Sequence, residues 1–223
     1  MKNHKLSKLL LASVISSLTV PTFAQQLEEV VVTASKRAEN LQDIPQAVTA
    51  FSSERLVELG IVETSDLMGA IPNIQVTSAY GRTQPNFSIR GISVANEFSA
   101  ATASPVGVYV DEVYQSFRAS HGQQLFDLES VEVLRGPQGT LYGRNTTGGA
   151  VNVNTIKPSL GEGASGFLNV RLGNYSYADF TGAVEATIIP DLLGVRLSGA
   201  VSEADGYVDN TLLGTDHPQT SST

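Results

Sequence analysis

The clearest pattern in the chain is an alternation of apolar and polar residues in its last third. Leu168, Val170 and Leu172 occupy alternate positions, and the polar residues Asn169 and Arg171 lie between them. Two further segments alternate in the same way, with apolar members at Phe180, Val184, Ala186 and Ile188 and at Leu193, Val195, Leu197 and Val201. Turn-forming pairs, Asn174-Tyr175 and Pro190-Asp191, separate the three segments. Such strands are typical of a transmembrane β-barrel wall, although a soluble sandwich alternates too.

Residues 46–158 have a different pattern, in which short strands and short helices are interspersed. Strands are predicted at residues 47–51, 87–90, 106–111 and 130–134. Ser52 and Ser53 can cap one helix, and a second short helix is expected to begin near Thr64 and to end before Ile71-Pro72. Residues 125–128 are expected to form a turn of helix. This mixture predicts a compact α+β domain with a mixed sheet.

Residues 1–24 have the layout of a secretory signal peptide. Lys2, Lys5 and Lys8 precede an apolar run at residues 9–20, and small residues surround a cleavage point after Ala24. The apolar run is too short to span a bilayer comfortably, and no later run approaches the roughly 20 apolar residues of a membrane helix. We therefore expect an exported chain that enters a membrane only as a β-barrel.

Composition excludes several classes of function. The chain of 223 residues has no Cys and only three His, which removes thiol chemistry and leaves no material for a multi-His metal site. Without the leader, 11 basic residues stand against 22 acidic ones, so nucleic-acid binding is unfavourable. Asp111 and Glu112 are adjacent on a predicted strand and point to opposite faces, so they do not form the carboxylate pair of a hydrolase. We expect no catalytic residue, no metal and no cofactor.

The most specific stretch is the Gly-rich segment at residues 131–153, which runs from a strand through Arg135-Gly136-Pro137 to a Gly-rich turn and an Asn-containing strand. It strongly resembles the plug signature of the TonB-dependent outer-membrane receptors. Residues 87–91 and 108–113 resemble two earlier plug strands, and residues 28–34 resemble the TonB box. The resemblance covers residues 27 to about 201.

The resemblance implies an α+β plug domain with a mixed four-stranded sheet, followed by the first antiparallel strands of an incomplete transmembrane β-barrel. The implied divisions are a signal peptide at 1–24, a TonB box and linker at 25–45, a plug at 46–158 and the start of a truncated barrel at 163–223. Three strands cannot close a barrel, whose smallest bacterial form has about eight, so we expect the front of a longer protein or a truncated product.

The resemblance also implies residue roles. The TonB-binding strand would be Glu28, Glu29, Val30, Val31, Val32, Thr33 and Ala34. Arg90 and Arg135 would pair with carboxylates of the barrel lumen such as Glu185. Ligand-facing plug loops would contribute Tyr80, Arg82, Gln84, Phe117, Arg118 and His121, because an aromatic ring and an Arg suit stacking and anion binding.

The leading hypothesis is energy-coupled uptake of a scarce solute, an iron–siderophore above all, with cobalamin or an oligosaccharide as further cargoes. Its partners would be TonB with its inner-membrane energising complex, the solute and outer-membrane lipid. The alternative is a truncated or soluble periplasmic plug module that binds TonB without forming a pore. Insertion into the outer membrane separates the two.

Overall fold

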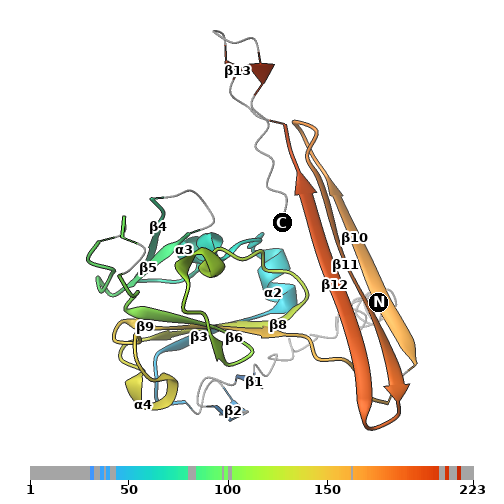
Figure 1. Ribbon diagram of the computed structural model, residues 1–223, viewed down its shortest axis with the longest axis horizontal. Coiled ribbons are helices and arrows are strands. Elements are labelled where there is room, and N and C mark those ends of the chain that lie inside the picture. Colours follow the sequence, from blue (N-terminus) through green and yellow to red (C-terminus); the bar gives the residue numbers. More distant parts are fainter. Residues whose placement is uncertain are drawn as a thin grey trace, which may run out of the picture.

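The computed structural model describes residues 31–32, 36–37, 39–40, 44–79, 84–96, 98–99, 102–161, 163–205, 209–210 and 215–216. The predicted signal peptide lies outside these residues. Among the described residues, no helix has the length and the apolar character needed to span a membrane. Figure 1 shows two parts, an α+β domain and a long antiparallel sheet beside it.

A mixed sheet of five strands forms the centre of the α+β domain. Its spatial order is β3 (Val48–Ser52), β8 (Leu128–Arg135), β9 (Gly149–Thr155), β6 (Val106–Val110) and β7 (Val113–Tyr114). Strands β6 and β9 pair in parallel, and the other neighbours pair antiparallel. The mixed sheet is confirmed, and the two-residue strand β7 adds a fifth member at one edge.

Short helices and a hairpin cover the upper face of this sheet (Figure 1). They are α2 (Ser53–Glu58), η3 (Thr64–Asp66), α3 (Leu67–Ala70), β4 (Ile74–Thr77) and β5 (Asn86–Ile89). The Ser52 side chain accepts from the backbone N–H of Arg55 at 3.4 Å, and this confirms the predicted cap. The predicted second helix is also present, and it ends before Ile71.

The helical turn predicted at residues 125–128 is wrong. The backbone N–H of Leu125 donates to the Val62 carbonyl at 2.6 Å, and β8 begins at Leu128. This bond to a distant segment holds the chain extended, and local propensity does not report it. The remaining short helices are η4 (Arg118–His121) and α4 (Gly139–Tyr142).

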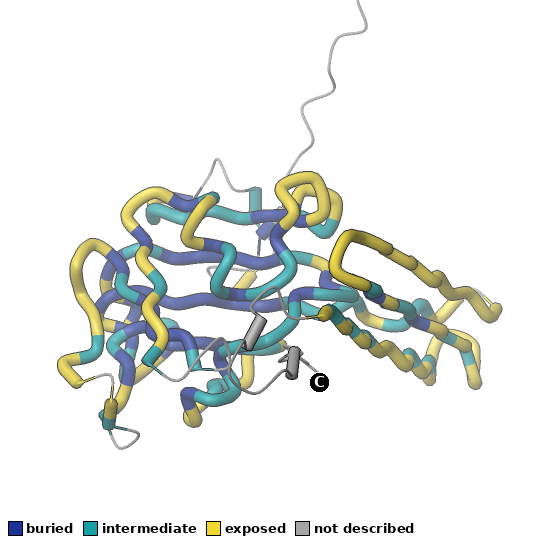
Figure 2. The backbone as a smooth tube through the Cα atoms, turned by 90° about the horizontal axis from the view of Figure 1, so that it is seen from above, coloured by how far each residue is buried: buried dark blue, intermediate teal, exposed yellow. Residues whose placement is uncertain are grey.

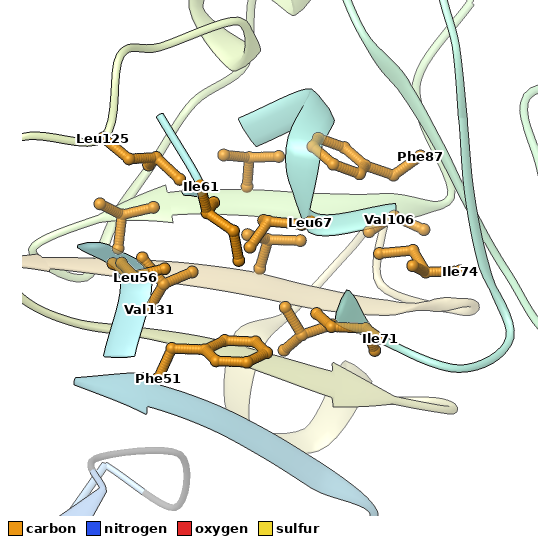
Figure 3. Packing of buried hydrophobic residues seen from close by; sticks show 14 of the residues in the cluster. Phe51, Leu56, Ile61, Leu67, Ile71, Ile74, Phe87, Val106, Leu125 and Val131 are labelled. Atoms are coloured by element: carbon orange, nitrogen blue, oxygen red, sulfur yellow. The ribbon is translucent and has the colours of Figure 1, made fainter. Parts of the chain in front are cut away.

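The central sheet is buried on both faces. Val131 and Val133 of β8 pack into the upper cluster, which Figure 3 shows around Leu67, Phe87 and Val106. Leu134 of the same strand belongs to a lower cluster with Val32, Ile44, Tyr109, Tyr142 and Ala150. Gly149, at φ +155°, lies where β9 meets β8, and a Cβ there would lie 2.3 Å from the Leu134 carbonyl oxygen. Only glycine fits that position.

The long sheet consists of β10 (Ala164–Leu172), β11 (Ala178–Ile189) and β12 (Leu193–Glu203), which we call the wall strands. Val170, Phe180 and Val201 are paired across the three strands on one face, and Asn169, Thr181 and Ala200 on the other. Figure 2 shows these strands as largely exposed, beside the buried centre of the α+β domain. The predicted alternation, with turns at residues 173–177 and 190–192, is therefore confirmed.

Two further pairs of short strands are present among the described residues. Strands β1 (Val31–Val32) and β2 (Glu39–Asn40) pair antiparallel, as do β13 (Asp209–Asn210) and β14 (Thr215–Asp216). Strands β1 and β2 lie beneath the central sheet, on the same side as α4 (Figure 1). This places the start of the described chain against the lower cluster.

Candidate functional site: the plug and its contacts

The described residues among positions 31–44, which we call the N-terminal segment, are docked on the lower face of the α+β domain. Val32 has none of its surface exposed and belongs to the lower cluster with Ile44, Leu134 and Tyr142. The ammonium of Lys36 lies 5.6 Å from the centre of the Tyr142 ring, within the range of a cation–π contact. Of the residues predicted to bind TonB, Val31 and Val32 form β1; Glu28, Glu29, Val30, Thr33 and Ala34 lie outside the described residues.

Tyrosines form the floor against which this segment packs. Tyr109 and Tyr142 meet edge to face at 4.9 Å between ring centres, and the Tyr109 hydroxyl donates to the Tyr142 carbonyl at 2.6 Å. Burial raises the pKa of both phenols, so neither ionises near neutral pH. The floor is therefore a rigid, neutral, largely apolar surface.

A buried polar network lies in the same sheet, on the same side as the tyrosines. Glu132, with no surface exposed, accepts from the side-chain amides of Asn152 and Asn154, each at 3.3 Å. The Asn154 amide also donates to the Ser130 hydroxyl at 2.9 Å. These bonds cross from β8 to β9 and fix the register of the two strands.

Arg90 and Arg135 lie at the Gly-rich turn. A guanidinium nitrogen of Arg90 lies 3.4 Å from the position that a Cβ would take at Gly136, the residue after Arg135. Arg90 is exposed, and the buried Nε of Arg135 has no hydrogen-bond partner among the described residues. The Arg90 guanidinium therefore lies beside the residue that follows Arg135, and the pairing of either arginine with a carboxylate of the wall strands stays a prediction.

Glu185, the carboxylate suggested for that pairing, has a different partner. It bonds Arg196 of β12 at 2.6 Å and accepts from the Ser165 hydroxyl at 2.8 Å. Arg196 in turn reaches across to the α+β domain, where its Nε and Nη2 bond the two carboxylate oxygens of Asp127 at 2.9 and 2.5 Å. The contact between domain and wall thus has its carboxylate on the domain and its guanidinium on the wall.

The predicted ligand-facing residues have different environments. Phe117 is 65% exposed, whereas Arg118 and His121 are buried. Arg118 donates to the Asn86 side-chain oxygen at 2.8 Å and to the Ser99 carbonyl at 2.5 Å, so it ties three segments together. The carbonyl of Gln84 accepts from the Ser78 hydroxyl at 3.1 Å, and Tyr80 and Arg82 lie outside the described residues.

His121 is enclosed by the same loop. The Nε2 atom of His121 lies 3.0 Å from the Gln115 carbonyl oxygen. The Thr64 hydroxyl donates to the backbone carbonyl of His121 at 2.7 Å. Burial, helped by the nearby Arg118, lowers the pKa of the imidazole despite the hydrogen bond to Gln115. The ring is therefore neutral at neutral pH.

Sequence reasoning missed Asp127 and Arg196 as partners. Arg196 alternates with the apolar residues Val195 and Leu197, which indicates a polar face, but Asp127 is separated from it by 69 positions. The sequence feature that could have pointed to Asp127 is that it is a lone carboxylate within an apolar run, Leu125-Phe126-Asp127-Leu128. No cluster of three metal-ligating side chains occurs among the residues that the structure describes.

Residues 40–150 match the family model described as the TonB-dependent Receptor Plug Domain. The chain belongs to the TonB-dependent receptor family. The α+β domain is its plug, and the wall strands that follow are the first strands of a β-barrel. Family membership also confirms the predicted location in the outer membrane.

Known relatives agree with this assignment. The chain is 34% identical over 138 residues to the pesticin receptor of Yersinia pestis, covering 61% of this chain and 20% of that protein. It is 28% identical over 213 residues to the ferrioxamine B receptor of Salmonella typhimurium, covering 88% of this chain and 29% of that protein. The chain therefore spans a fifth to under a third of the length of these two relatives.

A solved structure shares the fold. The crystal structure of the ferric yersiniabactin uptake receptor from Yersinia pestis superposes with a TM-score of 0.67 at 28% identity. The match covers 77% of this chain and 26% of the receptor. The plug and the wall strands described here thus occur together in a protein of known structure.

Proposed function

We propose that the protein takes part in energy-coupled uptake of a scarce solute, an iron–siderophore, across the outer membrane. The observation that carries this proposal is the docking of the N-terminal segment on the plug. A relative named for ferrioxamine B and a structural neighbour named for ferric yersiniabactin support the class of cargo. A transporter of vitamin B12 is also among the relatives, so cobalamin is the second candidate.

Docking and capture by TonB exclude one another. The backbone of Val31 and Val32 is paired with Glu39 and Asn40, and the Val32 side chain is buried in the lower cluster. Strand addition by TonB needs an accessible backbone, because main-chain hydrogen bonds supply its affinity. A solute that binds the outer side and favours the undocked form would therefore present this segment to TonB.

The outer side of the plug offers exposed aromatic rings for such a solute. Phe98 is 69% and Phe117 65% exposed. They immediately precede Ser99 and Arg118, which are joined by the hydrogen bond from the guanidinium. The buried cation fixes the two loops to one another, so both rings are held on a common support. An aromatic surface of this kind suits the aryl groups of many chelators.

A substitution at Val32 tests the proposal in cells that lack the native gene. The Val32→Pro variant removes a backbone N–H that strand addition uses, whereas Val32→Ala keeps it. Radioiron carried by ferrioxamine B or yersiniabactin, and radiolabelled cobalamin, serve as probes. We expect Val32→Ala to import one of them and Val32→Pro to hold it at the cell surface without import.

Two results would contradict this function. Import by Val32→Pro at the wild-type rate would mean that the segment is not the contact with TonB. A wild-type protein that restores neither binding nor import of any probe would favour the module that occupies TonB without forming a pore.

A further inference from the structure

Along α2, the plug faces the wall strands across a cavity. A cavity of about 370 Å³ separates α2 from β10 and β11, with Leu56 and Val57 on one side and Asn169 and Arg171 on the other. Asp127 lies at the margin of this cavity. Apolar packing therefore does not seal the plug to the wall along α2, and the polar contact at Asp127 has to hold this side.

Arg196 forms the polar contact between the plug and the wall strands. Its side chain is 12% exposed, and its three guanidinium nitrogens bond two carboxylates, Asp127 of the plug and Glu185 of β11. The Phe167 ring lies 6.0 Å from the guanidinium carbon. A planar fork bound at both edges and covered by a ring has one orientation, which a Lys could not reproduce.

The covalent link between plug and wall passes the same place. The backbone N–H of Ile156 donates to the Asp127 carbonyl at 3.3 Å, and the Thr187 hydroxyl donates to the Ser159 carbonyl at 2.9 Å. The backbone N–H of Asp191 donates to the Leu160 carbonyl at 3.1 Å. The linker is thus bonded to the plug at its start and to the wall at its end.

We propose that Asp127, Arg196 and Glu185 form a plug anchor, which keeps this side of the plug fixed to the wall while the N-terminal face is released. Arg196 acts as a positioning residue, because its three guanidinium nitrogens are bonded to Asp127 and Glu185. The anchor lies on the side of α2 and the linker, so a passage opens on the opposite side of the plug. This last point rests on the proposed function; the anchor itself does not.

Asp127→Asn is the variant of choice. Asp127 has a positive φ of 54°, which Asn tolerates well, so the exchange removes the charge without backbone strain. Asp111→Asn is a matched control, since Asp111 also has a positive φ, of 46°, but bonds Thr155 within the plug. Arg196→Gln and the double variant complete a cycle.

Hydrogen exchange of the full-length receptor, purified in detergent, measures the anchor without any solute. We expect Asp127→Asn and Arg196→Gln each to speed exchange at residues 124–128 by about tenfold, and the double variant to add little. Exchange in β3 should stay unchanged. Asp111→Asn should leave residues 124–128 at the wild-type rate.

The outcomes separate the anchor from general stability and from transport. Effects of Asp127→Asn and Arg196→Gln that simply add would mean two independent local defects and would overturn the anchor. Wild-type exchange at residues 124–128 in Asp127→Asn would overturn it as well. If Arg196→Gln prevents assembly, the exchange rates at residues 124–128 in Asp127→Asn and Asp111→Asn still test the anchor. A failed uptake assay leaves these exchange rates untouched, so loss of the proposed function and loss of the anchor are distinguishable.

Discussion

Side chains alternate between two faces in the central sheet of the plug and in the wall strands, but the two regions bury different kinds of residue. In β8, Val131, Val133 and Leu134 have no exposed surface. In β11, Val184 is 61% exposed, whereas Asp179 is 1% and Thr181 8% exposed. The central sheet packs against apolar side chains on both of its faces, whereas the wall has an outer face that meets hydrocarbon and an inner face that meets the plug.

The two regions are also stabilised differently. The plug depends on apolar packing on both faces of its sheet. The wall strands depend on their hydrogen-bond ladder and on paired charges on the polar face, such as Arg171 with Asp179 at 2.9 Å. Truncating an apolar side chain should therefore be costly in the plug and nearly neutral in the wall.

Removal of a core side chain should give the largest effect. Leu67 has no exposed surface, so Leu67→Ala should destabilise the plug by about 2–5 kcal/mol. Leu168 is 71% exposed on the wall, and Leu168→Ala should change stability by less than about 0.5 kcal/mol. Urea unfolding of the full-length receptor, followed by exchange in plug peptides, measures both. Equal losses would remove the contrast between the two regions.

A charge on the outer face of the wall should be nearly as costly. Leu168→Arg would place a guanidinium in hydrocarbon, at about 2–4 kcal/mol near the bilayer midplane. Asn169→Arg, on the neighbouring position, would place it beside the cavity at the plug. The amount of heat-modifiable protein in outer-membrane fractions should fall for Leu168→Arg only. A fall of equal size for both variants would contradict the assignment of the two faces.

Release of the N-terminal segment should have an intermediate effect. Val32→Asp would bury an unpaired carboxylate in the lower cluster, so the segment should undock. Limited trypsin digestion after the exposed Lys36 and Arg37 should then become about tenfold faster or more. Val57→Asp, at a residue 73% exposed on α2, is the control and should leave cleavage unchanged.

The smallest effect should be that of acid on the plug loop that contains His121. The folded-state pKa of His121 is lowered, so the unfolded loop takes up a proton first as the pH falls below about 6.5. Local stability should therefore be complete above that pH and decrease below it. Hydrogen exchange at residues 115–121, corrected for intrinsic rates, should speed up on acidification in the wild type and not in His121→Gln. A pH response that persists in His121→Gln would assign it to another group.

Local patterns explain what the sequence predicts well. The wall strands follow from their alternation, and α2 follows from the cap at Ser52, because both signals lie within a few residues. The Gly-rich stretch marks the plug for a similar reason. The backbone at Gly149 leaves no room for a side chain, so only glycine is accepted at this position.

Long-range contacts explain what the sequence does not predict. The parallel pairing of Val108 with Val151 joins segments with no shared local signal. The burial of Arg118 depends on acceptors at Asn86 and Ser99, and Asp127 meets Arg196 only once the plug lies against the wall. A charged residue in a loop suggests exposure until its distant acceptors are known.

Single-cysteine labelling at adjacent wall positions tests the central claim most directly, because the chain has no native Cys. A bimane fluorophore attached at Leu168→Cys or Asn169→Cys reports whether spin-labelled lipid reaches that position in outer-membrane vesicles. We expect strong quenching at residue 168 and little at residue 169, where the plug lies. Equal quenching at both positions, or quenching of neither, would contradict a barrel wall that turns its apolar face to lipid and its polar face to the plug.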